Sequence, residues 1–219
     1  MRTNETRLHP VVLAAACAVL MAAVPARAQT PNPGVFVSPP EGSVTVYQRK
    51  SEGSYGVYNG PVRWVMGRQD WNGRMLVSSV SERHGIALLD PVSHGTVAQL
   101  ASNGKPMYTF NPPLTYDWPL TVGKSWKVVA EMTTYQPPGV MPITVEYKVE
   151  ALEDVTVPAG SFKAYKVVSV NSFGETEQVW TVPSIGLRTV KVIRDRAAMH
   201  PLGPGHQEGV LVSQEAPKQ

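Results

Sequence analysis

Three residues of the types that bind metals or transfer protons fall near one another in the sequence: His84, Asp90 and His94. Imidazole and carboxylate groups can share a metal ion, and a histidine can activate a serine for hydrolysis. No two of the three have the short spacing that metal ligands usually show. We therefore expect no metal site here. A hydrolase would require one of the histidines to meet Asp90 or a serine in a cleft.

Other patterns that could carry out chemistry have simpler structural explanations. Val122-Gly123-Lys124-Ser125 resembles the end of a phosphate-binding loop, but that motif needs a glycine where Trp118 stands. The segment therefore predicts a tight turn. Glu146 and Glu150 share one face of a predicted strand with Lys148 between them, which indicates a charge-balanced, solvated face. No Gly-x-Ser-x-Gly or His-Glu-x-x-His pattern occurs. The sequence predicts no catalytic residue and no cofactor.

The aromatic residues are the remaining chemical resource, with five Trp, eight Tyr and four Phe. Such side chains either fill a core or line a pocket for an amphipathic ligand. Strand-like contexts favour the core for Trp64, Trp126 and Trp180, whereas Trp71 beside a turn and Trp118 before a proline favour exposure. The candidate ligand-binding residues are Trp71, Trp118, Tyr108 and Trp64.

Residues 1–28 have the pattern of a secretory signal peptide. Arg2 and Arg7 precede an apolar run from Val11 to Val24, and Ala26-Arg27-Ala28 supplies a cleavage site. The run is too short to span a bilayer, and no second apolar stretch follows it. We expect an exported, periplasmic protein without a transmembrane span. The alternatives are secretion, or a lipid anchor if Cys17 is acylated.

The predicted export changes what the composition implies. Cys17 is the only cysteine, so the processed chain would have no disulfide and no thiolate metal site. Removing three of 20 basic and one of 17 acidic residues leaves 17 against 16, a net charge of +1. We therefore expect no nucleic-acid partner, which would need a clustered basic face. The basic segment from Lys191 to Arg196 is interpreted as a solvated strand end.

Turn-forming residues and period-two patterns predict an all-β fold. The chain has 20 Pro and 18 Gly, and its hairpin signals are Asn59-Gly60, Asn72-Gly73 and Asn103-Gly104. From Ile143 to Ala151, apolar residues alternate with polar ones, as in a sheet with one buried face. We expect a strongly curved antiparallel sheet, an open barrel or clam-like meander of roughly ten strands, with little or no helix.

The same patterns set the expected domain limits. A proline-rich arm over 29–42 would follow the signal peptide and lead into a single β domain over 43–213. Proline-rich sequence favours an extended arm. The polar residues 214–219 are expected to form a flexible tail.

Three motifs follow one another in the second half of the chain: Val122-Gly123-Lys124-Ser125-Trp126, then 155–162 (VTVPAGSF), then 180–187 (WTVPSIGL). This succession resembles a family of exported bacterial β proteins classed only as a domain of unknown function. The resemblance covers roughly Leu120 to Val192. It implies a strongly curved antiparallel sheet and no catalytic residues. Within it, Gly160 and Gly186 suit turns with positive φ.

The main functional hypothesis is a non-catalytic envelope protein that binds an apolar or amphipathic ligand, such as a lipid, in its curved sheet. That hypothesis predicts an apolar cavity of at least about 300 Å³. The alternative is an interaction or assembly protein that docks another envelope protein through a strand edge or the proline-rich arm. A hydrolase of unknown class is the third hypothesis.

Overall fold

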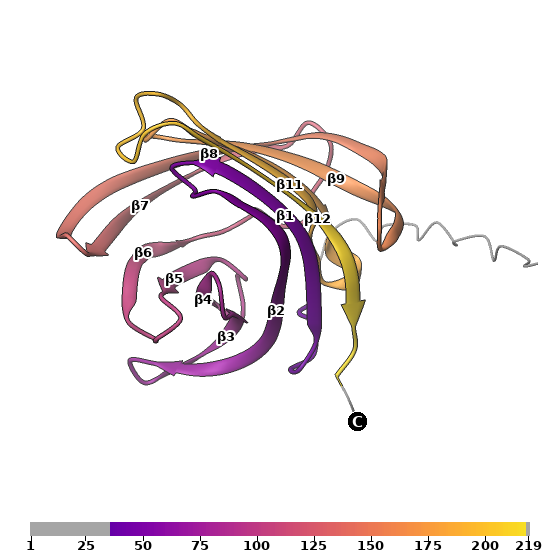
Figure 1. The fold of residues 1–219 in the computed structure, drawn as a ribbon, viewed down its shortest axis with the longest axis horizontal. Helices are drawn as coiled ribbons and strands as arrows, with labels where there is room; N and C mark the ends of the chain where they lie inside the picture. Colours follow the sequence, from indigo (N-terminus) through magenta and orange to yellow (C-terminus); the bar gives the residue numbers. More distant parts are fainter. Residues whose placement is uncertain (1–35, 218–219) are drawn as a thin grey trace, which may run out of the picture.

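The computed structural model describes residues 36–217, and the predicted signal peptide lies outside them. These residues form an antiparallel all-β fold with one short 3₁₀ helix, which confirms the expected fold class. The elements, shown in Figure 1, are β1 (Val44–Gly53), β2 (Tyr58–Trp71), β3 (Arg74–Ser81), β4 (Gly85–Leu89), β5 (Thr96–Leu100), β6 (Pro106–Leu114), β7 (Ser125–Tyr135), β8 (Pro138–Val157), β9 (Gly160–Asn171), β10 (Glu175–Val182), η1 (Pro183–Ile185), β11 (Leu187–Arg196) and β12 (Gly205–Glu215).

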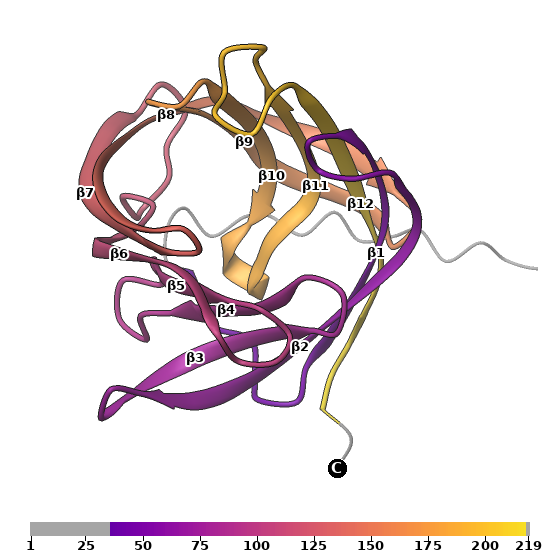
Figure 2. The same cartoon turned by 60° about the vertical axis from the view of Figure 1, so that its left-hand side comes forward.

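The twelve strands form a closed barrel in which each strand pairs with its neighbours in the chain. β1 completes the ring, because it pairs with β2 on one side and with β12 on the other. In Figure 2 the strands curve round to form a ring. The sequence analysis expected an open barrel or clam-like sheet, whereas the barrel is closed. Local patterns do not reveal closure, because closure depends on pairing between the two ends of the chain.

The two ends of the barrel differ in how they are covered. One end, called the arm end, carries η1 and residues 36–43; Val37 N–H donates to the Pro183 carbonyl at 3.1 Å, and Phe36 is buried. The opposite end, called the far end, carries the loops that follow β1, β3, β5, β7, β9 and β11. The last residues of the expected proline-rich arm are thus packed against the barrel.

Two of the three predicted Asn-Gly turns are correct and one is wrong. Asn72-Gly73 joins β2 to β3 with positive φ at both residues, and Asn103-Gly104 lies between β5 and β6. Asn59-Gly60 instead lies inside β2. The chain already reverses before it, at residues 54–57, where Gly53 and Gly56 supply positive φ. Two turns so close together would leave no strand between them.

The predicted strand from Ile143 to Ala151 forms the centre of β8. Its residues Ile143, Val145, Tyr147 and Val149 are buried, and they pack with Leu120 and residues of β6, β7 and β9 into the largest core cluster. The acidic residues on the opposite face pair with lysines, Glu146 with Lys127 and Glu150 with Lys166. The alternation therefore separates a packed inner face from a solvated outer one.

The motif turns form where the sequence places them. Gly123 has a φ of 89°, and the Lys124 N–H donates to the Thr121 carbonyl at 3.0 Å, so this segment is a tight turn. Gly160 begins β9 with a φ of 131°. Gly186 ends η1 with a φ of 72°, and a Cβ there would lie 2.6 Å from the Val37 carbonyl oxygen. Glycine at 186 therefore permits both the turn and the contact with the arm.

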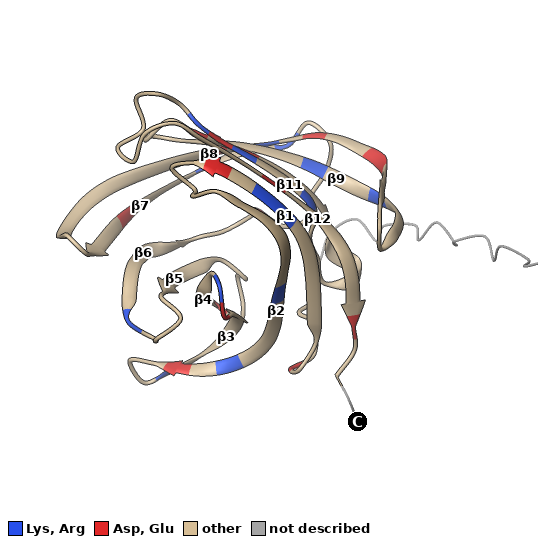
Figure 3. Ribbon diagram, in the orientation of Figure 1, with Lys and Arg blue, Asp and Glu red and all other residues tan. Residues whose placement is uncertain are grey.

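Charged residues occur on many strands, and in Figure 3 positions of opposite sign are interspersed along the ribbon. Within residues 36–217, no helix has the length and apolar character needed to cross a membrane.

Candidate functional site: the barrel cavity

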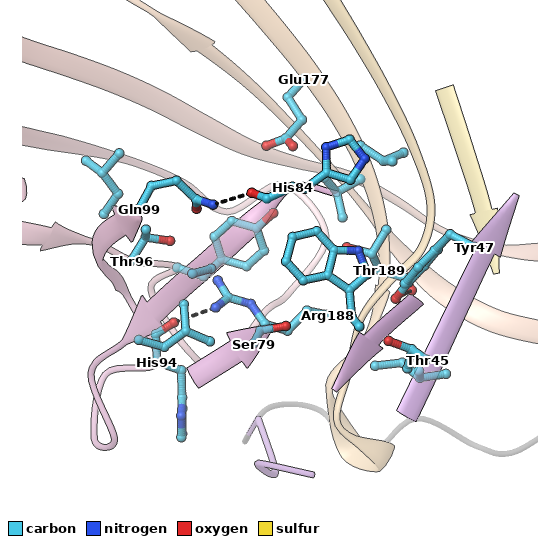
Figure 4. A pocket seen from close by; sticks show the side chains of 18 of the residues that line it. Thr45, Tyr47, Ser79, His84, His94, Thr96, Gln99, Glu177, Arg188 and Thr189 are labelled. Atoms are coloured by element: carbon cyan, nitrogen blue, oxygen red, sulfur yellow. Dashed lines mark hydrogen bonds between the residues drawn. The ribbon is translucent and has the colours of Figure 1, made fainter. Parts of the chain in front are cut away.

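The barrel encloses a cavity of about 540 Å³, which is called the barrel cavity below. This volume falls in the range of sites that hold small organic ligands, roughly 300–1,000 Å³. Figure 4 shows that Thr45 and Tyr47 of β1 face it from one side and Thr96 and Gln99 of β5 from the other. The main hypothesis expected an apolar wall, and that expectation is wrong. Four arginines and two glutamates contribute to the wall.

Two of these arginines form ion pairs with the two glutamates. On adjacent strands, β11 and β10, Arg194 binds Glu177 and Arg196 binds Glu175, the latter at 2.7 Å. The Tyr55 hydroxyl also donates to Glu175 Oε2 at 2.8 Å. Burial lowers the pKa of Arg194, but Glu177 and Glu175 outweigh that effect and raise it. Arg194 is therefore cationic, and its charge is already neutralised.

Arg49 of β1 is the most buried of the four arginines, with 9% of its surface exposed. Its Nη1 lies 3.3 Å from His84 Nε2, and its Nε–H is buried without a hydrogen-bond partner. Burial, together with Arg49 and two further arginines, lowers the pKa of His84 to about 4. The imidazole is neutral at pH 7 and leaves the charge of Arg49 uncompensated.

Arg188 of β11 lies toward the arm end. It donates to the His94 carbonyl at 2.8 Å, and its guanidinium carbon is 5.9 Å from the Phe36 ring centroid. Burial lowers the pKa of Arg188, while Tyr116 and Tyr147 act in the opposite direction. Within residues 36–217, neither Arg188 nor Arg49 forms a salt bridge with a carboxylate. The barrel cavity therefore has a net charge of +2, from four arginines and two glutamates with neutral histidines.

Aromatic side chains cover other parts of the same wall. Tyr147 and Tyr116 contact each other and also Trp126, with ring centroids 4.9–5.7 Å apart. Trp64 stacks on His84 with 6.0 Å between ring centroids and an angle of 12° between the planes. The barrel cavity thus presents aromatic faces next to cationic groups, the combination that suits an amphipathic molecule.

The four candidate ligand-binding residues divide into two pairs. Trp64 and Tyr108 line the barrel cavity. Trp71 is half-buried against the core cluster at β3–β5, and Trp118 stacks on Phe36 at 5.4 Å beside the main core cluster. Neither Trp71 nor Trp118 belongs to the cavity wall. A flanking turn or proline therefore did not indicate an exposed, ligand-facing side chain.

The interpretation of 191–196 as a solvated strand end is wrong. Arg194 and Arg196 face the barrel cavity, together with Arg188 and Val192 of the same strand. Their even-numbered positions share one face of β11, since side chains alternate along a strand. Glu175 and Glu177 do the same on β10. The sequence did contain one signal for these inward-facing charges: two neighbouring strands each mix charged and aliphatic residues on one face.

His84, Asp90 and His94 do not converge. His84 contacts Arg49 at the far end, whereas the Asp90 carboxylate accepts from Arg74 and from the backbone of its own turn. Within the described part of the chain, no three His, Cys, Asp or Glu side chains are grouped as a metal site. His94 Nδ1 does lie 3.3 Å from the Ser38 hydroxyl. No carboxylate hydrogen bond to that imidazole occurs in residues 36–217, so the pair lacks the acid that orients a catalytic histidine.

Comparison with known proteins shows no family assignment. No family model matches the chain, and no curated protein matches it significantly. Among solved structures, the hypothetical lipoprotein YmcC from Escherichia coli aligns with a TM-score of 0.43 and 11% identity, covering 82% of this chain and 86% of that one. A candidate lipoprotein from Parabacteroides distasonis gives 0.41 and 13%, covering 83% and 99%. A candidate exported protein with a YmcC-like fold from Bacteroides fragilis gives 0.39 and 13%, also covering 83% and 99%. No functional conclusion is drawn from similarities this low.

Proposed function

We propose that this chain is an exported, non-catalytic envelope protein that binds an amphipathic small molecule inside its barrel. The observation that supports this function is the barrel cavity of about 540 Å³, in which aromatic rings and unpaired cationic groups share one wall. An apolar ligand without a polar group fits this wall less well, because it would leave buried polar groups without partners.

The two kinds of wall surface would act on different parts of the ligand. Trp64, Tyr116 and Tyr147 offer faces against which an apolar body can pack. Arg49 and Arg188 offer donors for a polar head. A ligand held in this way would be removed from water over most of its surface, as is usual for small-molecule sites.

Filling the barrel cavity tests the proposal. Thr96→Trp would place a large side chain at the cavity wall, and Val129→Trp on β7, where Val129 is 58% exposed, is the matched control. Native mass spectrometry of each protein purified after export should show a co-purifying small molecule with the parent chain and the control, but not with Thr96→Trp. Circular dichroism checks that each variant folds. An empty parent chain would contradict the proposal.

The two other hypotheses have less support from the structure. Docking through a strand edge would have only partial edges to use among β1–β12, such as residues 125–130 of β7, which have no partner in β6, because the barrel closes on itself. Hydrolysis rests on the contact between Ser38 and His94. We expect the parent chain to hydrolyse a chromogenic ester only at the background rate, and Ser38→Ala to leave that rate unchanged. A parent activity that disappears in Ser38→Ala would show that the protein is an enzyme.

A further inference from the structure

We infer that the ligand is an acid, and that its carboxylate or phosphate head binds at Arg49, beside His84. This inference rests on the proposed function, since it specifies the head group of the amphipathic ligand and where that group lies. It uses the uncompensated charge of a guanidinium that is 9% exposed, at the wall of the barrel cavity.

The strands around Arg49 leave space for its guanidinium. Its partners in register on both sides are glycines, Gly60 of β2 and Gly209 of β12. A Cβ at Gly209 would lie 3.9 Å from Arg49 Nε and 3.3 Å from Val192, and a Cβ at Gly60 would lie 2.9 Å from the Tyr58 hydroxyl. Larger residues at either position would therefore crowd the side chains that surround the guanidinium.

Within residues 36–217, no carboxylate forms a salt bridge with Arg49 that would explain its burial. Buried guanidinium groups are normally paired with an acid, because burying an unpaired charge costs several kcal/mol. The side chain at hydrogen-bond distance from Arg49 is the imidazole of His84, which can accept one hydrogen bond but carries no negative charge. Arg194 adds repulsion, and Glu177, which is already paired with Arg194, adds a smaller attraction. A bound anion at the cavity wall would supply the missing charge.

His84 would contribute to the same site. Because an arginine only donates, His84 Nε2 accepts from Arg49 and the neutral ring carries its proton on Nδ1. The Nδ1–H then points away from Arg49, so the role of His84 is to orient the guanidinium beside the head group. Trp64, which stacks on the imidazole, would place an aromatic surface beside the head group.

The other three arginines are less suited to bind the head group. Arg194 and Arg196 are already paired with glutamates. Arg188 lacks a carboxylate but already donates to the His94 carbonyl and faces the Phe36 ring. Arg188 is therefore the alternative binding residue for the head group, at the arm end of the same cavity.

Binding of two amphiphiles that differ only in the head group tests the inference. Isothermal titration calorimetry at pH 7, below the micelle concentration, would compare dodecanoate with dodecan-1-ol, and would include acetate and inorganic phosphate. The variants are Arg49→Gln, Arg49→Lys, Arg188→Gln and, as a control, the exposed Arg63→Gln. Thermal unfolding of each variant checks the fold.

We expect the parent chain and Arg63→Gln to bind dodecanoate more tightly than dodecan-1-ol. Arg49→Gln should weaken dodecanoate binding roughly tenfold to a hundredfold, because it removes a charge-assisted hydrogen bond. It should leave the binding of dodecan-1-ol unchanged. Arg49→Lys, which keeps the charge, should lose less. These variants separate an ionic role from a merely structural one.

Several outcomes would overturn the inference. It fails if Arg188→Gln, and not Arg49→Gln, weakens dodecanoate binding, or if Arg49→Gln weakens both amphiphiles equally. It also fails if acetate or phosphate binds as tightly as dodecanoate, since the ligand would then be a free anion. Equal binding of both amphiphiles contradicts the acid but retains the proposed function, whereas binding of neither contradicts the proposed function itself.

Discussion

The sector of the barrel formed by β7, β8 and β9 differs from the sector formed by β10, β11, β12 and β1. Both present one strand face to the interior. In the first sector that face is aliphatic and aromatic and packs around Leu120, which is fully buried. In the second it carries Arg49, Arg194 and Glu177 beside a cavity. The first sector stabilises the barrel by close packing, and the second leaves space and uncompensated charge inside it.

This difference shows that an inward position in a barrel does not require an apolar residue. The Arg194 and Glu177 side chains keep 34% and 23% of their surface exposed, although they lie inside the ring of strands. The exposed area faces the barrel cavity, which can hold water. The second sector can therefore carry charges that the first sector could hold only at a large cost in stability.

The largest expected effect is in the packed sector. Leu120→Ala should lower the free energy of unfolding by about 2–5 kcal/mol, because it removes buried methyl groups and leaves a void that the surrounding side chains fill only in part. Urea denaturation measures the loss. The matched control is Val122→Ala in the next turn, where Val122 is 56% exposed and should lose little. A loss from Leu120→Ala as small as the control's would mean that this sector is not closely packed.

A smaller effect is expected from the charged sector. A double-mutant cycle with Glu177→Gln and Arg194→Gln should give a coupling energy of about 1 kcal/mol, less than for a fully buried pair because cavity water screens it. Urea denaturation of the four proteins measures it. A coupling energy as large as the loss in Leu120→Ala would remove the contrast between the two sectors.

The last expected effect is a dependence of stability on pH, confined to one range of pH. Since the pKa of His84 is lowered from 6.5 to about 4, the unfolded chain takes up a proton first as the pH falls. The contribution of His84 is therefore fully present above pH 6.5 and is lost between pH 6.5 and 4. His84→Gln should show a weaker fall in its urea midpoint over that range. Curves that stay parallel to those of the parent chain would show that His84 is not buried in its neutral form.

Much of the packed sector could be predicted from sequence, because its signal lies within single strands. Alternation from Ile143 to Ala151 is enough to assign the inner face of β8. Barrel closure could not be predicted in this way, since it depends on the pairing of Val44–Gly53 with Gly205–Glu215 across the whole chain.

The candidate site was harder to predict for the same reason. Arg194 and Arg196 were assigned to solvent because a charged residue on a single strand usually faces water. Here the space that these arginines face is the barrel cavity, inside the ring of strands. Arg49 carries no local signal at all, since the glycines that make room for it come from two other strands.

The pairing of β1 with β12 has a consequence for how the protein is made. A chain that is synthesised or translocated from its N-terminus presents β1 long before its second neighbour exists. Until Gly205–Glu215 emerges, one side of Val44–Gly53 keeps its amide and carbonyl groups unpaired, and the incomplete ring can recruit a strand from another molecule. Chaperone protection during biogenesis is therefore needed most in the interval before the last eleven-residue strand arrives.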